Sequence, residues 1–579
     1  MTAWKFDQKI VRKGLAYMII VEELPFRFVE RKAFRYFMSL SQPLFKVPSR
    51  STITRDIYNM FLEEKRKVRD FIKNNVGRIC LTTDTWTSNQ QSSYMCLTAH
   101  FIDNEWKLRN KVLAFCLQEN HRGVDIGKAI EKCLQEWEIE NILTVSVDNA
   151  SANDVAIDFL KKVFQNSSKC LLNAKWIHIR CVAHIINLVV QDGIKKVDKS
   201  VNKIRWAVWW IRKSPSRIDK FNEFAKVVNA NTQKHLLLDV PTRWNSTYLM
   251  LEVAQSYEKT FERYDIEESV FRTELEKAGH NEIKSEDWQS VRTLCHFLKP
   301  FYDITQRVSG THYVTSNSCI DEIYQIRDIL DKAIGSNTLC QIAMTMNEKF
   351  RKYYGDIKKV NLLLYFALVL DPRNKKHYLN LLFIDRYGKE LAEKNLKIVM
   401  DSMSELYNEY IRIHSQCSST TTTTESSDSS TLGKRQNLED TTSKSHLRNK
   451  LREQMQTQTV EPVGELDKFL NEGFEKDSGN FNLLEWWKVN SPRFPILSLM
   501  ARDLFAIPVS TVASESVFST SGRVLDPYRS SLTPRIVQSL VCTQDWLRDG
   551  STSIQGLLDE EDWDTIQEID KALDTEENT

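Results

Sequence analysis

The sequence lacks several features that would place it in a familiar class. It has no apolar run long enough to span a lipid bilayer and no apolar stretch of secretory type. No Cys-x-x-Cys pair is followed by two histidines, so we predict no structural zinc site. The 11 cysteines are scattered without paired spacing, which favours reduced thiols and an intracellular setting. We therefore expect no membrane partner and no disulfide scaffold.

The net charge of the chain is also close to zero. The 79 basic and 77 acidic side chains almost cancel, so a nucleic-acid partner would have to be met by local basic patches. The chain is long enough, at 579 residues, for about three or four domains. Hydrophobic residues make up 41% of it, which is enough for sizeable cores.

Two apolar runs each end in an aspartate. Ile79–Asp84 and Ile142–Asp148 both read as buried strands, with the carboxylate at the carboxyl-terminal edge where open α/β sheets place their sites. A single aspartate at a strand end is usually a turn former or a helix cap. Two carboxylates at adjacent strand ends, however, repel each other unless they are protonated or bound to a cation.

A third acid, Glu515, lies near the other end of the chain and alone would be an ordinary helix glutamate. Two strand-end aspartates and a distant helical glutamate would suit two divalent cations. Such a pair of metals drives in-line attack at phosphodiesters.

The pattern of elements from residue 79 onward is α/β and then α. We expect strands at 79–85, 93–102, 107–117, 142–148 and about 176–179, with helices at 124–138, 153–164 and 182–196. Residues 197–410 read as mostly helical. A charged helix is expected at 47–78; it reads as a solvated face with ion pairs or as a DNA contact.

Six stretches of the chain carry a resemblance to a known family. They are 81–88 (LTTDTWTS), 97–103, 147–153, 180–184, 241–247 and the block 486–546. Together they resemble the hAT superfamily of DNA transposases, in particular its plant RICESLEEPER- and DAYSLEEPER-like members. The resemblance runs from about residue 4 to 547. The BED zinc finger of these relatives is missing, as in a truncated copy or a gene model that starts late.

The resemblance implies an α/β plus all-α fold. An RNase H-like core is interrupted by a large helical insertion and is followed by a helical C-terminal dimerisation region. The expected units are a helical N-terminal segment at 1–78, the first part of the core at 79–196, the helical insertion at 197–414, a disordered linker at 415–463, the dimerisation region with the last catalytic acid at 464–548, and an acidic tail at 549–579.

The resemblance also implies a catalytic set. Asp84, Asp148 and Glu515 would hold two Mg²⁺ or Mn²⁺ ions. Glu515 is assigned from Ala513-Ser514-Glu515 with Phe518-Ser519. Ser516 stands where the family commonly has arginine, a departure that leaves the metal ligand untouched but removes a possible DNA or ion-pair contact.

Five residues are candidates for DNA contact. The resemblance implies that His184 helps to position DNA, and the alternative is a histidine that caps or packs beneath the core helix. Cys181 in the same Cys-x-x-His motif reads as structural. Trp244 would support an unstacked base, with Arg243 beside it; alternatively, the two form a surface cation–π pair. Arg205 and Lys213 lie in 203–213, where basic and aromatic residues interleave. Core packing of the tryptophans with snorkelling bases is the simpler interpretation there, and a DNA-facing surface is the alternative.

The C-terminal block carries apolar stripes that we interpret as a dimer contact. These stripes contain Leu497, Leu504, Phe505, Ile536 and Leu540. The basic residues dispersed after the threonine-rich segment 420–424 would act as a nuclear import signal or as a phosphate-binding strap.

The sequence thus predicts a hAT-type transposase or a protein derived from one: nuclear, dimeric or higher in order, DNA-binding and of plant type. If active, it cuts DNA at the ends of a transposable element and joins strands. The alternatives are a domesticated, catalytically silent DNA-binding regulator and a decaying copy with no role.

Overall fold

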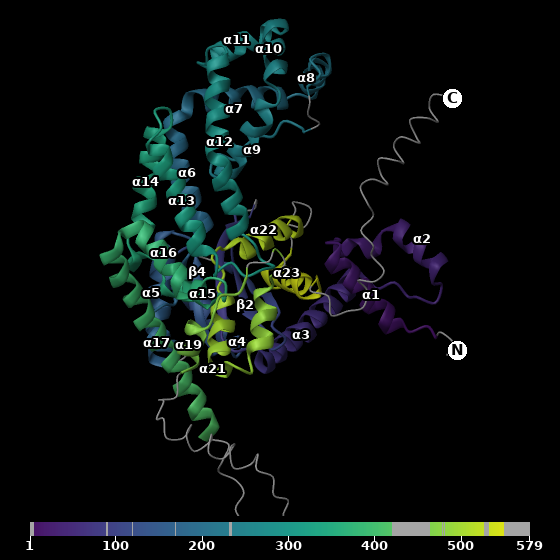
Figure 1. Cartoon of the computed structure of the whole chain (residues 1–579). Coiled ribbons are helices and arrows are strands. Elements are labelled where there is room, and N and C mark those ends of the chain that lie inside the picture. Colours follow the sequence, from purple (N-terminus) through teal and green to yellow (C-terminus); the bar gives the residue numbers. More distant parts are fainter. Residues whose placement is uncertain are drawn as a thin grey trace, which may run out of the picture.

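A five-stranded mixed sheet forms the centre of the computed structural model (Figure 1). The structure describes residues 5–88, 91–118, 120–167, 170–230, 234–419, 464–476, 479, 481–525 and 532–548. The strands are β1 (Ile79–Thr87), β2 (Ser93–Ile102), β3 (Leu108–Gln118), β4 (Ile142–Val147) and β5 (His178–Arg180). Their order in the sheet is β3-β2-β1-β4-β5, with β2 antiparallel to both its neighbours and β1, β4 and β5 mutually parallel.

The register of β1 and β4 brings the two predicted aspartates to the same level. Thr82 of β1 pairs with Ser146 of β4. Asp84 and Asp148 each lie two residues further along, and in parallel strands equal steps keep neighbours together. The two aspartates therefore lie at the same edge of the sheet, as the strand pattern predicted.

Helices α4 (Gly123–Glu136) and α5 (Ser151–Ser167) connect the strands, and α6 (Val182–Ile194) follows β5 directly. The helical insertion then rises from the sheet (Figure 1). It comprises α7 (Asp198–Arg212), α8 (Pro215–Val227), α9 (Trp244–Gln255), α10 (Glu258–Glu267), α11 (Ser269–Lys277), α12 (Ser285–Val308), α13 (Cys319–Ile334), α14 (Cys340–Tyr354), α15 (Leu362–Leu370), α16 (Lys375–Tyr387) and α17 (Lys389–Ser419). Short 3-10 turns lie at Phe26–Glu30, Leu171–Ala174, Lys195–Val197 and Ile357–Lys359.

Helices from the N-terminal and C-terminal parts of the chain pack against each other beside the sheet. The N-terminal helices are α1 (Gln8–Val21), α2 (Lys32–Ser41) and α3 (Arg50–Asn75). The C-terminal helices are α19 (Glu465–Asn471), α20 (Leu483–Asn490), α21 (Pro495–Phe505), α22 (Val512–Val524) and α23 (Pro534–Arg548). Trp546 of α23 stacks on Phe61 of α3 with ring centroids 5.4 Å apart, and its indole donates to Val112 O at 2.8 Å.

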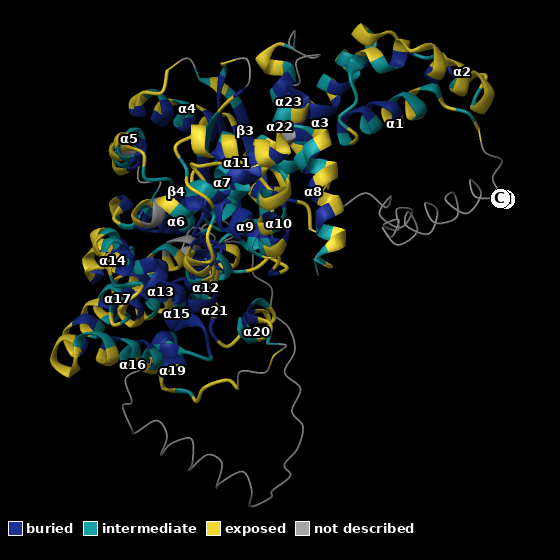
Figure 2. Ribbon diagram, turned by 90° about the horizontal axis from the view of Figure 1, so that it is seen from above, coloured by how far each residue is buried: buried dark blue, intermediate teal, exposed yellow. Residues whose placement is uncertain are grey.

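The predicted dimer stripes are buried inside the chain itself (Figure 2). Leu497 and Leu504 are 0% exposed and Phe505 is 1% exposed, because α21 packs against β2, α15 and α17. Leu540 of α23 is 5% exposed, and Ile536 is half-buried against the core that α23 shares with β3 and the N-terminal helices. The amphipathic pattern was read correctly as a buried face. Its partner, however, is this chain's own core, so these side chains do not offer a free surface to a second copy.

Most of the other helices and strands expected from the sequence are present in the structure. The helix predicted at 47–78 is α3, and the strands and helices predicted from 79 to 196 are present with shifts of one to three residues at most ends. The predicted linker at 415–463 lies outside the described residues except for 415–419, which continue α17; the tail at 549–579 also lies outside them. Across the described helices, none combines the length and apolar composition that a membrane span requires.

Candidate catalytic site

Asp84 and Asp148 lie at the carboxyl edge of the two central parallel strands, and both side chains are half-buried. Asp84 Oδ1 accepts a hydrogen bond from the Thr85 amide at 2.7 Å. Asp148 Oδ1 accepts from the Ala150 amide at 2.9 Å and from Asn153 Nδ2 at 2.5 Å. Each carboxylate is thus oriented through one oxygen by its own turn.

Glu515 reaches this edge because residues 508–511, here called the strap, run along the sheet before α22 begins. Glu515 lies in the first turn of α22. Three hydrogen bonds hold the strap: Ser146 Oγ donates to Pro508 O at 2.7 Å, the Val182 amide donates to Val509 O at 2.8 Å, and the Thr511 amide donates to Cys181 Sγ at 3.4 Å. A stretch more than 300 residues further along the chain is therefore fixed to β4 and to the start of α6.

Alternate residues of β1 face α22, because successive side chains of a strand point to opposite sides. Thr82 Oγ1 lies 3.0 Å from Ser514 Oγ of α22. Trp86 stacks on Phe518 of α22, with ring centroids 6.0 Å apart and an interplanar angle of 12°. Asp84 lies midway between Thr82 and Trp86 on the same face, and so it faces the helix that carries Glu515.

A buried polar network extends the Thr82–Ser514 contact. Ser514 is 0% exposed and its Oγ also lies 3.4 Å from Thr98 Oγ1. Thr82 Oγ1 lies 2.9 Å from His100 Nε2. Burial lowers the pKa of His100 to about 3, so the imidazole is neutral and can exchange a hydrogen bond with the threonine. The network is buried and holds α22 in place against β1 and β2.

The charges of the other two acids act on the pKa of Asp84. Burial, above all, raises the pKa of Asp84 to about 7, and the negative charges of Asp148 and Glu515 contribute to the rise. The Thr85 amide and the positive charge of Arg243 act in the opposite direction. Charges act in this way only over short distances, so Asp148, Glu515 and Arg243 all lie around Asp84.

This donor set suits hard divalent cations, which prefer carboxylate oxygens. Burial first, and then the neighbouring acids, disfavour the charged form of Asp84, and a bound cation would favour it. Within the described parts of the chain, no three His, Cys, Asp or Glu side chains are close enough to hold a metal ion as they stand. The side chains would have to move together on binding.

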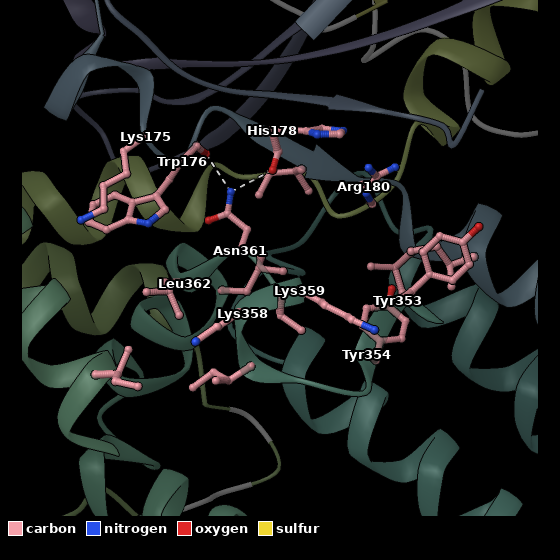
Figure 3. Close-up of a pocket in the computed structure, with 17 residues that line it drawn as sticks. Lys175, Trp176, His178, Arg180, Tyr353, Tyr354, Lys358, Lys359, Asn361 and Leu362 are labelled. Atoms are coloured by element: carbon pink, nitrogen blue, oxygen red, sulfur yellow. Dashed lines mark hydrogen bonds between the residues drawn. The ribbon is translucent and has the colours of Figure 1, made fainter. Parts of the chain in front are cut away.

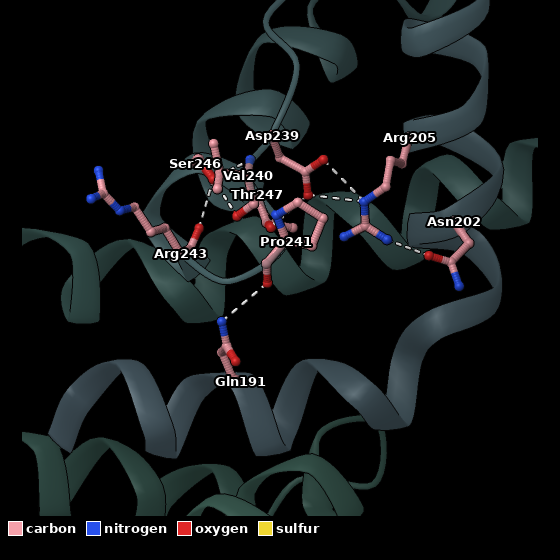
Figure 4. A network of polar contacts seen from close by, with 9 residues as sticks. All are labelled: Gln191, Asn202, Arg205, Asp239, Val240, Pro241, Arg243, Ser246 and Thr247. Carbon is pink, nitrogen blue, oxygen red and sulfur yellow. Dashed lines mark hydrogen bonds and ion pairs between the residues drawn. The ribbon is translucent and has the colours of Figure 1, made fainter. Parts of the chain in front are cut away.

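The turn that carries Arg243 is held by α6 (Figure 4). Gln191 Nε2 of α6 donates to Pro241 O at 3.1 Å, and Asn187 Oδ1 accepts from the Trp244 amide at 3.2 Å. Ser246 Oγ accepts from the Val240 amide at 2.8 Å, which closes the turn. The Arg243 side chain is exposed. It is thus a cation that can reach a phosphate near Asp84.

Trp244 does not share this exposure. Its side chain is 2% exposed and packs in the core of the insertion, 6.3 Å from the ring of Tyr248. Its indole Nε1 has no hydrogen-bond partner among the described residues. In this structure the ring is not accessible to an unstacked base, and it does not lie on the surface as the alternative of a surface cation–π pair requires.

The other three DNA candidates lie in different settings. His184 is half-buried, and its amide donates to Cys181 Sγ at 3.4 Å, which makes Cys181 the cap of α6 and confirms its structural role. Arg205 forms an ion pair of 2.9 Å with Asp239, a carboxylate that is 2% exposed (Figure 4). Lys213 is exposed, with Nζ 4.7 Å from the centre of the Trp209 ring. The structure does not bring Arg205 or Lys213 into the acid cluster.

Comparison with known proteins agrees with this geometry. Residues 82–176 match the ZBED1 RNase-like domain, 179–297 match the ZBED1 RNase-like helical domain, 317–410 match the hAT-like transposase, RNase-H fold, and 465–547 match the hAT family C-terminal dimerisation region. Zinc finger BED domain-containing protein RICESLEEPER 2 of Oryza sativa is 34% identical over 556 residues, covering 94% of this chain and 75% of that protein.

The chain belongs to the hAT transposase family. Two further relatives support the assignment. The AC transposase of Zea mays is 34% identical, covering 99% of this chain and 70% of that protein. Zinc finger BED domain-containing protein DAYSLEEPER of Arabidopsis thaliana is 31% identical, covering 95% and 75%. The hAT match at 317–410 is helical in this structure, whereas every strand that the structure describes lies between 79 and 180.

Sequence reasoning missed the residues that build the hAT site around its acids. Ser514, Thr82 and His100 fix α22, and none of them was singled out. The only available signal was the alternation of Thr82, Asp84 and Trp86, which places a polar residue on the site face of β1. That alternation does not reveal which distant serine meets it.

Proposed function

We propose that this hAT protein is a metal-dependent DNA-cleaving and strand-joining enzyme with Asp84, Asp148 and Glu515 as its catalytic acids. One observation carries the proposal: the pKa of Asp84 is raised to about 7 by burial and by the charges of Asp148 and Glu515. Three carboxylates from β1, the end of β4 and α22 are held together against their mutual repulsion. Groups with pKa values shifted in this way cluster at functional sites, which supports a catalytic role.

The roles of the residues follow from their positions. Asp84, Asp148 and Glu515 would hold Mg²⁺ or Mn²⁺. Bound there, such ions activate water or a 3′-hydroxyl and stabilise the leaving oxygen. Arg243, exposed beside Asp84, binds a phosphate of the DNA strand. The Thr82–Ser514 contact keeps Glu515 opposite Asp84 when the charged DNA enters.

A nicking assay tests the proposal. Full-length protein is incubated with Mn²⁺ and DNA that carries candidate terminal repeats, and nicked product is measured with and without EDTA. The matched control for Asp84→Asn is Asp158→Asn, because Asp158 of α5 is an acid with an exposed side chain. We expect nicking by the parent and the Asp158 variant only. Equal nicking by the Asp84 variant would overturn the assignment.

The second candidate is a catalytically silent DNA-binding and dimerising regulator. Two observations favour it. Among the described residues, the three acids are not close enough together to hold a metal ion, and the Trp244 side chain is buried. Such a protein would bind DNA equally well in EDTA and in Mn²⁺ and would leave it intact.

We also propose an assembly, a cellular location and domain boundaries for the protein, whichever of the two activities it has. Matches to the hAT dimerisation region and to transposases support a DNA-bound homodimer or a higher homo-oligomer in the nucleus. The unit boundaries proposed are those expected from the sequence: 1–78, 79–196, 197–414, 415–463, 464–548 and 549–579. Light scattering and imaging of a tagged chain would test the assembly and the location.

A further inference from the structure

A cavity of about 370 Å³ lies between β5 and the helical insertion, apart from the three acids (Figure 3). One wall is the segment from Lys175 to Arg180. The other is the end of α14 with the turn at Ile357–Lys359 and the start of α15. The volume lies within the range of sites for small organic ligands, about 300–1,000 Å³.

The charge of the lining is one-sided. Four lining residues are cationic and, within the described residues, none is acidic; the cations are Lys175, Arg180, Lys358 and Lys359. Two of them are neutralised from outside the cavity, since Lys175 pairs with Glu405 at 2.7 Å and Arg180 pairs with Asp154 at 2.9 Å.

The other two cations, Lys358 and Lys359, have no acidic partner in the described part of the chain. Lys359 Nζ donates only to the carbonyl of Arg351, at 3.1 Å, and both side chains are exposed. The nearby Asp356 is occupied as the cap of the turn, where it accepts from the Lys358 amide at 2.9 Å. The two side chains point to different sides of the turn (Figure 3), and each carries an uncompensated ammonium group that is suited to a phosphate.

Hydrogen bonds hold the two walls of the cavity together, and aromatic side chains lie along them. Asn361 Nδ2 donates to Trp176 O at 2.7 Å and to His178 O at 2.9 Å, so the insertion is tied to the segment leading into β5. Trp176 and Tyr353 lie at opposite ends of the cavity (Figure 3). Aromatic rings beside phosphate-binding cations are the combination that recognises nucleotides, because the base stacks while the phosphate is neutralised.

We propose that this cavity binds a nucleoside phosphate, with separate phosphate groups at Lys358 and Lys359 and the base against an aromatic side chain. The ligand is either a free nucleotide or a nucleotide of single-stranded DNA, which share this chemistry. Arg180 of the wall also donates to Asn149 at 3.0 Å, and Asn149 follows Asp148. An occupied cavity therefore contacts the loop that carries a proposed catalytic acid, although its binding does not depend on catalysis.

Equilibrium binding in EDTA tests the proposal with the full chain. EDTA removes any metal-mediated phosphate binding at the acids, so loss of cleavage and loss of this site are distinguishable. The ligands are ATP, inorganic phosphate and oligo(dT). The double variant Lys358→Ala/Lys359→Ala should weaken binding of ATP or oligo(dT) by about tenfold or more. For oligo(dT), the slope of log affinity against log salt should fall by about 1.4, since each phosphate contact contributes about 0.7 on single strands.

The matched control is Lys332→Ala/Lys389→Ala, which removes two exposed lysines that do not line the cavity. The control should bind like the parent. A loss confined to ATP identifies a free nucleotide as the ligand, and a loss confined to oligo(dT) identifies single-stranded DNA. Equal losses in both double variants, or no loss in the first, would overturn the proposal.

A second measurement avoids any doubt about folding of the variant. In the parent protein, ATP or oligo(dT) should protect Lys358 and Lys359, but not Lys332, from an amine-reactive label. Equal labelling of all three lysines with and without ligand would also overturn the proposal.

Discussion

At the scale of single residues, the protonation of Asp84 is the property most open to experiment. Its pKa is raised to about 7, chiefly by burial and further by Asp148 and Glu515, so the folded chain holds this proton more tightly than the unfolded chain does. The group therefore favours folding below pH of about 4, and that contribution is lost as the pH rises to about 7. Without metal, the charged form of Asp84 opposes folding at neutral pH.

The first prediction follows from this sign. In EDTA, the melting temperature of the parent should fall more steeply between pH 4 and pH 7 than that of Asp84→Asn. Over this range the parent should lose up to about 4 kcal/mol more unfolding free energy than the variant. Mn²⁺ at pH 8 should raise the melting temperature of the parent but not that of the variant, because a cation stabilises the charged acids. Calorimetry from pH 4 to pH 8 measures both effects. Parallel pH curves for the two proteins would contradict the raised pKa.

Trp244 gives the second prediction. Its side chain is enclosed, so Trp244→Ala should cost about 3–5 kcal/mol of unfolding free energy and weaken binding to intact duplex and to DNA with an unpaired base alike. Trp244→Phe keeps a ring and removes the unpartnered indole N–H, so it should melt close to the parent. Chemical denaturation and binding to the two DNAs are the measurements. A stable alanine variant that fails only on the unpaired substrate would show that the ring swings out to meet a base.

At the scale of elements, the site depends on how α22 is seated on β1. Ser514 is 0% exposed and meets Thr82 and Thr98, whereas Ser516 on the same helix is exposed and donates only to Val512 O at 2.9 Å. The two serines therefore form a matched pair for testing this seating.

We predict that Ser514→Ala costs about 1–2 kcal/mol and lowers metal-dependent nicking, because the buried Thr82 and Thr98 hydroxyls each lose one partner and Glu515 is less firmly placed. Ser516→Ala should change stability by less than about 0.5 kcal/mol. Thermal melts and nicking rates distinguish the two. If both serines behave alike, the buried network does not position the helix.

The elements also show what sequence alone could reveal. The apolar runs ending at Asp84 and Asp148 predicted both strands and the edge at which these acids meet, since parallel neighbours align their ends. Glu515 carried no such signal: only the resemblance of its motif identified it, and the strap that brings it in depends on contacts with Ser146, Val182 and Cys181. Periodicity marked α21 and α23 as having buried faces, but it could not say which surface covers them. Nor could it reveal Lys358 and Lys359 opposite Trp176, because a cavity forms only when two distant segments pack.

At the scale of the whole molecule, the C-terminal region is part of the fold before it is part of any dimer. It matches the hAT dimerisation region, yet α21 lies against β2, α15 and α17 of the same chain. Its exposed apolar side chains lie elsewhere and include Phe474 and Val489, which are 54% and 68% exposed. A contact between copies through this region would have to use such exposed side chains and not the buried stripes.

The last prediction separates folding from assembly. Leu504→Asp places a charge where the parent side chain is 0% exposed, so it should cost more than about 4 kcal/mol and yield an unfolded or aggregated chain, not a folded monomer. Val489→Asp is the control: it lies in the same region but is exposed, and it should change stability by less than about 0.5 kcal/mol. Circular dichroism reports folding, and light scattering reports mass. A Leu504→Asp protein with a parental melt and half the parental mass would restore α21 as the dimer contact, because a charge that spares the fold but breaks the assembly must lie at an interface between copies.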